Sequence, residues 1–222
     1  MKRINIMKRF CALVLLTLLG VGLSSKAEAL IVTGQITGGT ALTQGGSFIE
    51  LIGFNGAVGN NTFQNNNLYG FNEDQDIALP SALTADVGML NLPTGTEVAS
   101  HYIFFDPRNT QTVHGFVEFD QDVLAIMTSR PNLMASDLLI TNSVTYLNPV
   151  LRGLEPITNR DIAWIDAVNS NRINLRFRAS TPGDYIRIFT EQAPPSHSAP
   201  EPASMLLLGA GLSGAFFLRR RK

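Results

Sequence analysis

The chain has 222 residues, of which 45% are hydrophobic and 16% are charged, and its formal net charge is −1. The charge is unevenly distributed, because residues 30–200 contain eight arginines, no lysine and sixteen acidic residues, whereas nine basic residues lie at the two ends. An acidic body without lysine argues against nucleic acid or an anionic membrane as its binding partner, since both require a basic surface.

Residues 1–29 have the pattern of a secretory signal peptide. Basic residues precede an apolar stretch over residues 10–23, and Ala27 and Ala29 supply the small side chains expected at the cleavage positions. We therefore expect export through the Sec machinery and a mature chain that begins at Leu30. The single cysteine lies within the apolar stretch, so the exported chain has no disulfide and depends on its hydrophobic core.

Along the body, apolar residues recur with a period of two, which is typical of strands with one buried face. The clearest case is residues 172–178, where three apolar residues alternate with polar ones. A turn with Pro and Gly follows at residues 180–184, so we expect a hairpin with a second strand over residues 185–190. Further strands are predicted at residues 47–52, 97–105, 112–119, 123–128, 143–147 and 162–168, and one short helix at residues 131–140, capped by Asn132 or Ser136.

Turn-forming residues separate these short strands throughout the body. The pattern favours an all-β fold, an antiparallel β-sandwich or jelly-roll-like single domain with about eight to ten strands over residues 30–191. Residues 192–199 are rich in Pro, Ser and Ala, so we predict a flexible stalk there.

Two groups of acidic residues are candidate ligands for calcium, because hard oxygen ligands suit that ion. The first is Glu73, Asp74 and Asp76, and the second is Glu118, Asp120 and Asp122. Neither group follows the calcium-loop spacing, so solvated turns and strand edges are the favoured interpretation, and no metal or cofactor is predicted. His101 and His114 lie on successive predicted strands that could pair as a hairpin, but no third ligand stands at metal spacing.

Four arginines on the predicted hairpin form a candidate binding patch for an acidic polysaccharide. They are Arg172, Arg176 and Arg178 on the first strand and Arg187 on the second. The alternative is a solvated sheet face whose arginines pair with nearby acids. Tyr102 and Trp164 lie inside apolar alternating runs, so we expect both in the core rather than on a sugar-binding surface.

The C-terminus combines three adjacent features. Pro200, Glu201 and Pro202 are followed by an apolar run over residues 203–218 and then by Arg219, Arg220, Arg221 and Lys222. As a helix the run would reach about 24 Å, slightly short of the ~30 Å hydrocarbon core of a bilayer. We predict a transmembrane helix with a basic cytoplasmic stop, which holds the chain transiently in the inner membrane.

This tail resembles the PEP-CTERM sorting signal of Gram-negative bacteria, which an exosortase in the inner membrane recognises and processes. The resemblance covers residues 200–222 and implies export and release to the cell surface or to the extracellular polysaccharide matrix. It implies no activity of the body. Residues 60–76, 98–107 and 144–155 also resemble the body of an uncharacterised group of proteins that carry the same tail.

Together these features favour a non-enzymatic surface or matrix protein that associates with exopolysaccharide. The alternative is a secreted polysaccharide hydrolase that uses carboxylates such as Asp120 and Asp122. A concave cleft with paired acids would favour the hydrolase, and a flat aromatic or arginine-rich face would favour binding.

Overall fold

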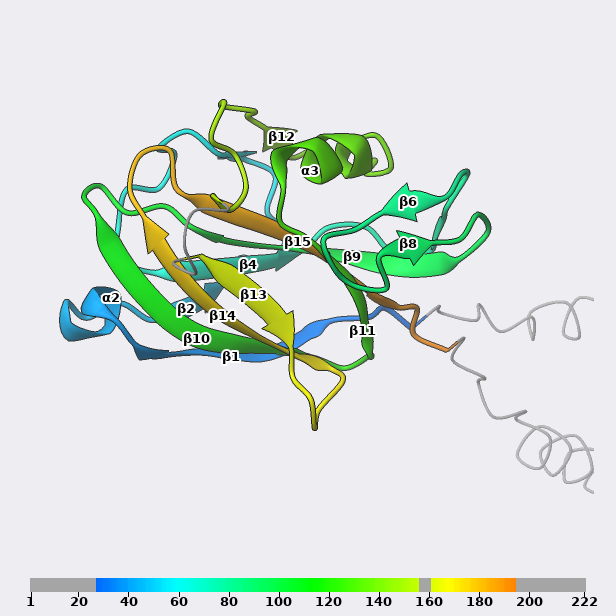
Figure 1. Cartoon of the computed structure of the whole chain (residues 1–222), viewed down its shortest axis with the longest axis horizontal. Helices are drawn as coiled ribbons and strands as arrows, with labels where there is room; N and C mark the ends of the chain where they lie inside the picture. The colour runs from blue at the N-terminus through cyan, green and yellow to red at the C-terminus, as the bar shows by residue number, and fades with distance from the viewer. Residues whose placement is uncertain (1–26, 156–160, 195–222) are drawn as a thin grey trace, which may run out of the picture. The chain divides into compact units, whose positions relative to one another are not determined.

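The computed structural model of the chain describes residues 27–155 and 161–194, and its secondary structure is mainly strand, with 44% strand and 7% helix (Figure 1). Within this part, no helix is long and apolar enough to cross a membrane. Several predicted features lie outside the described residues: the first 26 residues of the signal peptide, the sorting motif Pro200, Glu201 and Pro202, the apolar run 203–218, and the basic end Arg219, Arg220, Arg221 and Lys222.

One sheet has four strands in the order β1-β10-β14-β13, and all of its pairs are antiparallel. Its strands are β1 (Ile31–Gly38), β10 (Gln111–Phe119), β14 (Arg172–Ala179) and β13 (Ile162–Ile165). The alternation of apolar and polar residues along β10 and β14 gives this sheet one buried face and one open face.

A second sheet has seven strands, with the order β2-β4-β9-β15-β11-β7 and β5 paired to β9. Its strands are β2 (Phe48–Glu50), β4 (Leu68–Asn72), β5 (Ile77–Ala78), β7 (Val87–Gly88), β9 (Glu97–Phe105), β11 (Val123–Met127) and β15 (Asp184–Glu191). Only the pair of β2 with β4 is parallel in this sheet.

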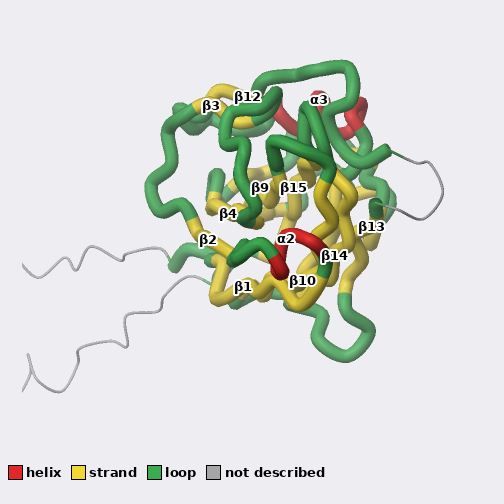
Figure 2. The backbone as a smooth tube through the Cα atoms, turned by 90° about the vertical axis from the view of Figure 1, so that its left-hand side faces the viewer, coloured by secondary structure: helices red, strands yellow, loops and turns green. Residues whose placement is uncertain are grey.

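Smaller elements complete the described part. They are the parallel pair of β3 (Ala57–Val58) with β12 (Thr145–Tyr146), the antiparallel pair of β6 (Leu83–Thr84) with β8 (Asn91–Leu92), and the helices α2 (Thr40–Thr43) and α3 (Arg130–Asp137). Figure 2 shows α3, β3 and β12 beyond β9 and β15, opposite the four-stranded sheet.

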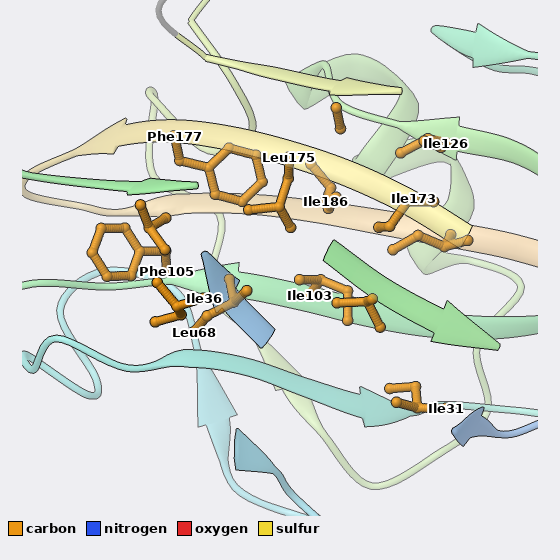
Figure 3. Close-up of a cluster of buried hydrophobic side chains, with 14 of the residues drawn as sticks. Ile31, Ile36, Leu68, Ile103, Phe105, Ile126, Ile173, Leu175, Phe177 and Ile186 are labelled. Atoms are coloured by element: carbon orange, nitrogen blue, oxygen red, sulfur yellow. The ribbon is translucent and has the colours of Figure 1, made fainter. Parts of the chain in front are cut away.

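Two hydrophobic clusters form the core, one on each side of the seven-stranded sheet. The first cluster joins that sheet to the four-stranded one, with Ile103 and Ile186 facing Leu175 and Phe177 (Figure 3). The second cluster contains the alternate residues of the same strands, including Phe104, and Leu133 of α3. Strands β9 and β15 are therefore buried on both faces.

Five strand predictions are confirmed, because each of these strands is present within one residue of its expected ends. They are the strands predicted at residues 97–105, 112–119, 123–128, 172–178 and 185–190. Those at 47–52, 143–147 and 162–168 are present but shorter. The helix predicted over residues 131–140 is α3. Its N-cap position is Ser129 rather than Asn132 or Ser136.

The predicted hairpin of residues 172–178 with 185–190 is wrong. β14 pairs with β10 and β13, whereas β15 pairs with β9 and β11, so the turn between them carries the chain from one sheet to the other. The same holds for the connection from β9 to β10, which separates His101 from His114. Alternation identifies a strand with a buried face, but it does not identify the strand's hydrogen-bonded neighbour.

Candidate functional site

The open face of the four-stranded sheet, called here the outer face, carries a row of side chains across all four strands. The register aligns Trp164 of β13 with Asn174 of β14, Asn174 with Phe116 of β10, and Phe116 with Gln35 of β1. Directly opposite residues lie on the same face of a sheet, so these four side chains form one line. Trp164 is 42% exposed, which makes it the most accessible aromatic side chain of the row.

Trp164 therefore does not lie in the core, and that prediction is wrong. β13 is an edge strand, and its inward positions are Ala163 and Ile165, which pack against the first hydrophobic cluster. Because side chains alternate along a strand, Trp164 must point outward. The matching prediction for Tyr102 is confirmed, since its exposed fraction is 1%.

Arg172 lies at one end of the outer face and is already paired. Its guanidinium donates to Glu118, with 2.7 Å between Nε and Oε1, and lies 4.2 Å from the centre of the Phe116 ring. The carboxylate offsets the charge of Arg172 and the cation covers one side of the aromatic ring. The expectation that these arginines pair with nearby acids is confirmed for Arg172.

Arg176 and Arg178 extend the outer face toward its other end. Arg176 stands between Ile162 of β13 and His114 of β10, and Arg178 is exposed opposite Thr112. The backbone N–H of Arg178 donates to Asp161 Oδ1 at 2.5 Å, so an acid lies at this edge of the sheet. Two guanidinium groups and an imidazole thus lie further along the same face than the row that contains Trp164 and Phe116.

Arg187 does not belong to this patch, and the prediction that it does is wrong. Its side chain is completely buried and forms an ion pair with Glu73, with 2.7 Å between Nε and Oε2. The guanidinium also donates to Asp137 at 2.9 Å and Ser136 at 2.7 Å. The ring of Tyr102 is 5.2 Å from the guanidinium carbon. Arg187 is buried because β15 lies in the middle of the seven-stranded sheet, beneath α3.

The sequence of β15 contains a signal for the burial of Arg187. Tyr185, Arg187 and Phe189 share one face of β15, and Ile186 and Ile188 share the other. A strand that is apolar on both faces is expected to be buried on both. An arginine within such a strand needs buried partners, which Glu73 and Asp137 provide.

The carboxylates of the second candidate calcium group are held apart by different partners. Glu118 pairs with Arg172, Asp120 accepts a hydrogen bond from the Leu30 backbone, and Asp122 accepts one from the Ser170 hydroxyl at 2.6 Å. In the first group, Glu73 is buried against Arg187 and Asp74 accepts hydrogen bonds from Thr141. Over residues 27–155 and 161–194, no set of three or more His, Cys, Asp or Glu side chains is placed to hold a metal ion.

Two hollows in the described part of the chain have carboxylates in their lining. A hollow of about 400 Å³ is lined by Glu50, Asp74 and Leu30, and another of about 310 Å³ by Asp86, Glu155 and Asp161. Neither is lined by Asp120 or Asp122, and these two carboxylates bind different parts of the chain.

The two histidines have different environments. His101 is completely buried, and its ring nitrogens lie 2.7 Å from Asn72 Oδ1 and 3.1 Å from Thr190 Oγ1. Burial lowers the pKa of His101 to about 3, so its ring is neutral at physiological pH. His114 is exposed on the outer face. The two side chains therefore do not form a shared site.

Comparison with protein families identifies the C-terminal tail. Residues 198–222 match the PEP-CTERM protein-sorting motif, which confirms the predicted sorting signal and supports an exosortase substrate with a β-rich body. Comparisons with curated proteins and with solved structures gave no match.

Proposed function

We propose that this chain is a non-enzymatic exported protein, sorted by an exosortase through its PEP-CTERM tail, whose body associates with acidic exopolysaccharide at the cell surface or in the matrix. The sorting motif supports export and processing. The outer face of the four-stranded sheet is the proposed contact surface. The observation that carries this proposal is the row of side chains that includes exposed Trp164 and spans all four strands.

The chemistry of the outer face suits an extended acidic glycan. An aromatic side chain offers a flat apolar surface for a sugar ring, and arginine can bind a carboxylate through two parallel hydrogen bonds. Trp164 supplies the first feature, and Arg176 and Arg178 supply the second. Neighbouring strands are about 4.8 Å apart, so a row across four strands extends about 14 Å, which is long enough for several sugar contacts.

The proposal includes a sandwich arrangement of the two large sheets. The first hydrophobic cluster supports it, since Val117 and Phe177 of one sheet share that cluster with Ile103 and Ile188 of the other. A sheet held from behind by such a core would keep the side chains of its outer face at fixed spacings, which lowers the entropy cost of binding.

Binding of the purified protein to polygalacturonate, with dextran as the neutral comparison, tests the proposal. We expect Trp164→Ala and the double variant Arg176→Ser with Arg178→Ser each to weaken binding at least tenfold. The matched controls are Leu138→Ala, which removes an exposed apolar side chain just after α3, and Arg130→Ser, which removes an arginine from α3 itself. Equal losses in the variants and their controls, or no binding to either polysaccharide, would refute the proposed contact surface.

A further inference from the structure

The residue that follows the predicted cleavage position is held by a single acid. The backbone nitrogen of Leu30 donates to Asp120 Oδ1 at 2.8 Å, and the backbone nitrogen of Asp120 donates to the Leu30 carbonyl at 3.0 Å. The next residue, Ile31, donates its N–H to Asn72 Oδ1 at 3.0 Å and is buried in the core at the start of β1. Leu30 is therefore held through both its backbone N–H and its carbonyl oxygen.

We infer that Asp120 is a binding site for the new amino terminus of the mature chain, in which the α-ammonium group of Leu30 forms an ion pair with the Asp120 carboxylate. The inference rests on the proposed export and on cleavage between Ala29 and Leu30. Hydrolysis of that peptide bond adds water, leaves a carboxylate on Ala29 and converts the Leu30 amide nitrogen to an amine that takes up a proton.

The existing geometry already suits the charged group. The separation of 2.8 Å lies within the range of charge-assisted N–H···O bonds, so the nitrogen need not move when it becomes an ammonium. Cleavage replaces a neutral donor with a cation at the same atom. The hydrogen bond to Asp120 becomes an ion pair without a new conformation.

The surroundings of Leu30 also favour a positive charge. The hollow beside it is lined by Glu50, Glu73 and Asp74, and by Glu28, which cleavage removes. Glu73 is paired with Arg187, whereas burial raises the pKa of Glu50. On the adjoining strand β10, Glu118 is paired with Arg172. The charged groups near the new terminus are thus mainly acidic, apart from these two paired arginines.

The structure also places the cleavage position inside the folded body. Ala29 is fully buried, and its N–H donates to Gln75 Oε1 at 2.7 Å. A peptidase needs an accessible extended chain on both sides of the bond it cuts, so cleavage must come before β1 docks. The terminus that it creates is then captured when the body folds.

The composition of the chain allows a direct test. From Leu30 onward the only lysine is Lys222, so a chain spanning residues 30–222 has two primary amines, the Leu30 terminus and the Lys222 side chain. We would release this chain from a fusion partner in detergent and measure the rate of amine acetylation at both positions from pH 6 to 9 by mass spectrometry. The Lys222 amine is the internal reference for reagent and pH.

We expect the Leu30 amine to titrate above the usual α-amino range of about 7.7–8.0 and to react more slowly than in Asp120→Asn. A pKa difference of half a unit corresponds to about a threefold difference in rate below the pKa. Asp120→Glu retains the charge and should react at a rate closer to the native one. Circular dichroism and urea unfolding establish that each variant is folded, and if Asp120→Asn is unfolded, a Leu30 midpoint within the ordinary range in the native chain refutes the ion pair by itself.

Two results would overturn the inference in different ways. Equal Leu30 rates in the native chain and Asp120→Asn would show that Asp120 does not bind the ammonium. An intact mass of the protein from producing cells that begins at another residue would refute the cleavage position, and so the inference, without bearing on glycan binding by the outer face.

Discussion

Replacing Arg187 tests the buried charge cluster beneath α3. Arg187 and Glu73 both have fully buried side chains, and their ion pair is supported by Asp137, Ser136 and the ring of Tyr102. The variant Arg187→Met keeps most of the side-chain volume and removes the charge. It leaves Glu73 as a buried carboxylate without its cation, while Asp137 keeps its ion pair with Arg152.

The expected loss of stability in Arg187→Met follows from this geometry. Removing one partner of a buried ion pair typically lowers the free energy of unfolding by about 3–5 kcal/mol, because the remaining charge is buried without compensation. That is a large share of the total stability of a domain, about 5–15 kcal/mol. For a domain of this size, the loss corresponds to a decrease in Tm of about 6–20 °C.

Urea unfolding followed by circular dichroism measures the effect. The double variant Arg187→Met with Glu73→Gln removes both charges, so it should be more stable than the sum of the two single losses predicts, by about 1–3 kcal/mol. Arg178→Ser is the matched control, because an exposed arginine should change stability by no more than about 0.5 kcal/mol. A loss below about 1 kcal/mol for Arg187→Met, or strict additivity in the double variant, would contradict the buried ion pair.

Three further predictions concern single side chains. Burial raises the pKa of the Asp184 carboxyl, so the folded state binds the proton of this carboxyl more tightly than the unfolded state does. The free energy of unfolding should therefore decline as the pH rises above about 4. Urea unfolding of Asp184→Asn should lack that decline. The contribution of His101 to the pH dependence of stability has the opposite sign, because burial lowers the pKa of His101 from 6.5 to about 3. The free energy of unfolding should therefore fall as the pH falls through this range. If the same pH dependence persists in His101→Gln, it does not arise from His101. Trp164 is the only tryptophan and is 42% exposed, so its fluorescence should be accessible to a soluble quencher and should lose that accessibility when polygalacturonate is bound.

The sequence predicted the long strands β9, β10, β14 and β15, whether one face is buried, as in β10 and β14, or both are, as in β9 and β15. β14 was found because its alternation is unbroken. β1 and β4 were not predicted, because glycines interrupt their patterns. These glycines have a packing role: a Cβ atom on Gly34 would lie 2.6 Å from the Phe48 ring, and one on Gly70 would lie 2.7 Å from Ile103. Both are contacts between residues distant in the chain, which a local pattern cannot reveal.

The same limit applies to the start of α3. The sequence around α3 predicted Asn132 or Ser136 as the N-cap. In the structure, Asp86 accepts hydrogen bonds from the backbone N–H groups of Thr128 and Ser129, at 2.7 and 2.8 Å. Asn132 also donates to Asp86, at 2.8 Å. An acid from a distant loop thus stabilises the positive end of the helix. Neither predicted residue is the N-cap, because the side chain that binds the start of α3 comes from a residue distant in the chain.

The candidate surface was predictable only in part, for a related reason. Arg172, Arg176 and Arg178 share the open face of β14 as their spacing predicts. Trp164 and Phe116 join them only through the pairing of β13, β14 and β10. Arg187 leaves the patch because β15 enters the other sheet. Spacing within a strand therefore predicted which side chains share a face, and pairing between strands decided which faces meet.

The charge of the body decides how an acidic polysaccharide can bind to the outer face. Residues 30–200 carry eight arginines against sixteen acids, and the buried arginines Arg152 and Arg187 are matched by Glu73 and Asp137, so the surface remains strongly acidic. At low ionic strength, where screening extends over about 30 Å, the whole body repels a polyanion. At physiological salt the screening length is about 8 Å, which suppresses this repulsion but preserves close contacts with Arg176 and Arg178. At about 1 M salt those contacts are weakened too. Binding of polygalacturonate should therefore pass through a maximum at intermediate salt, whereas binding of dextran through Trp164 should be nearly independent of salt. If polygalacturonate binding instead falls steadily from the lowest salt upward, the polyanion responds to a local positive field that is stronger than the field of the whole acidic body.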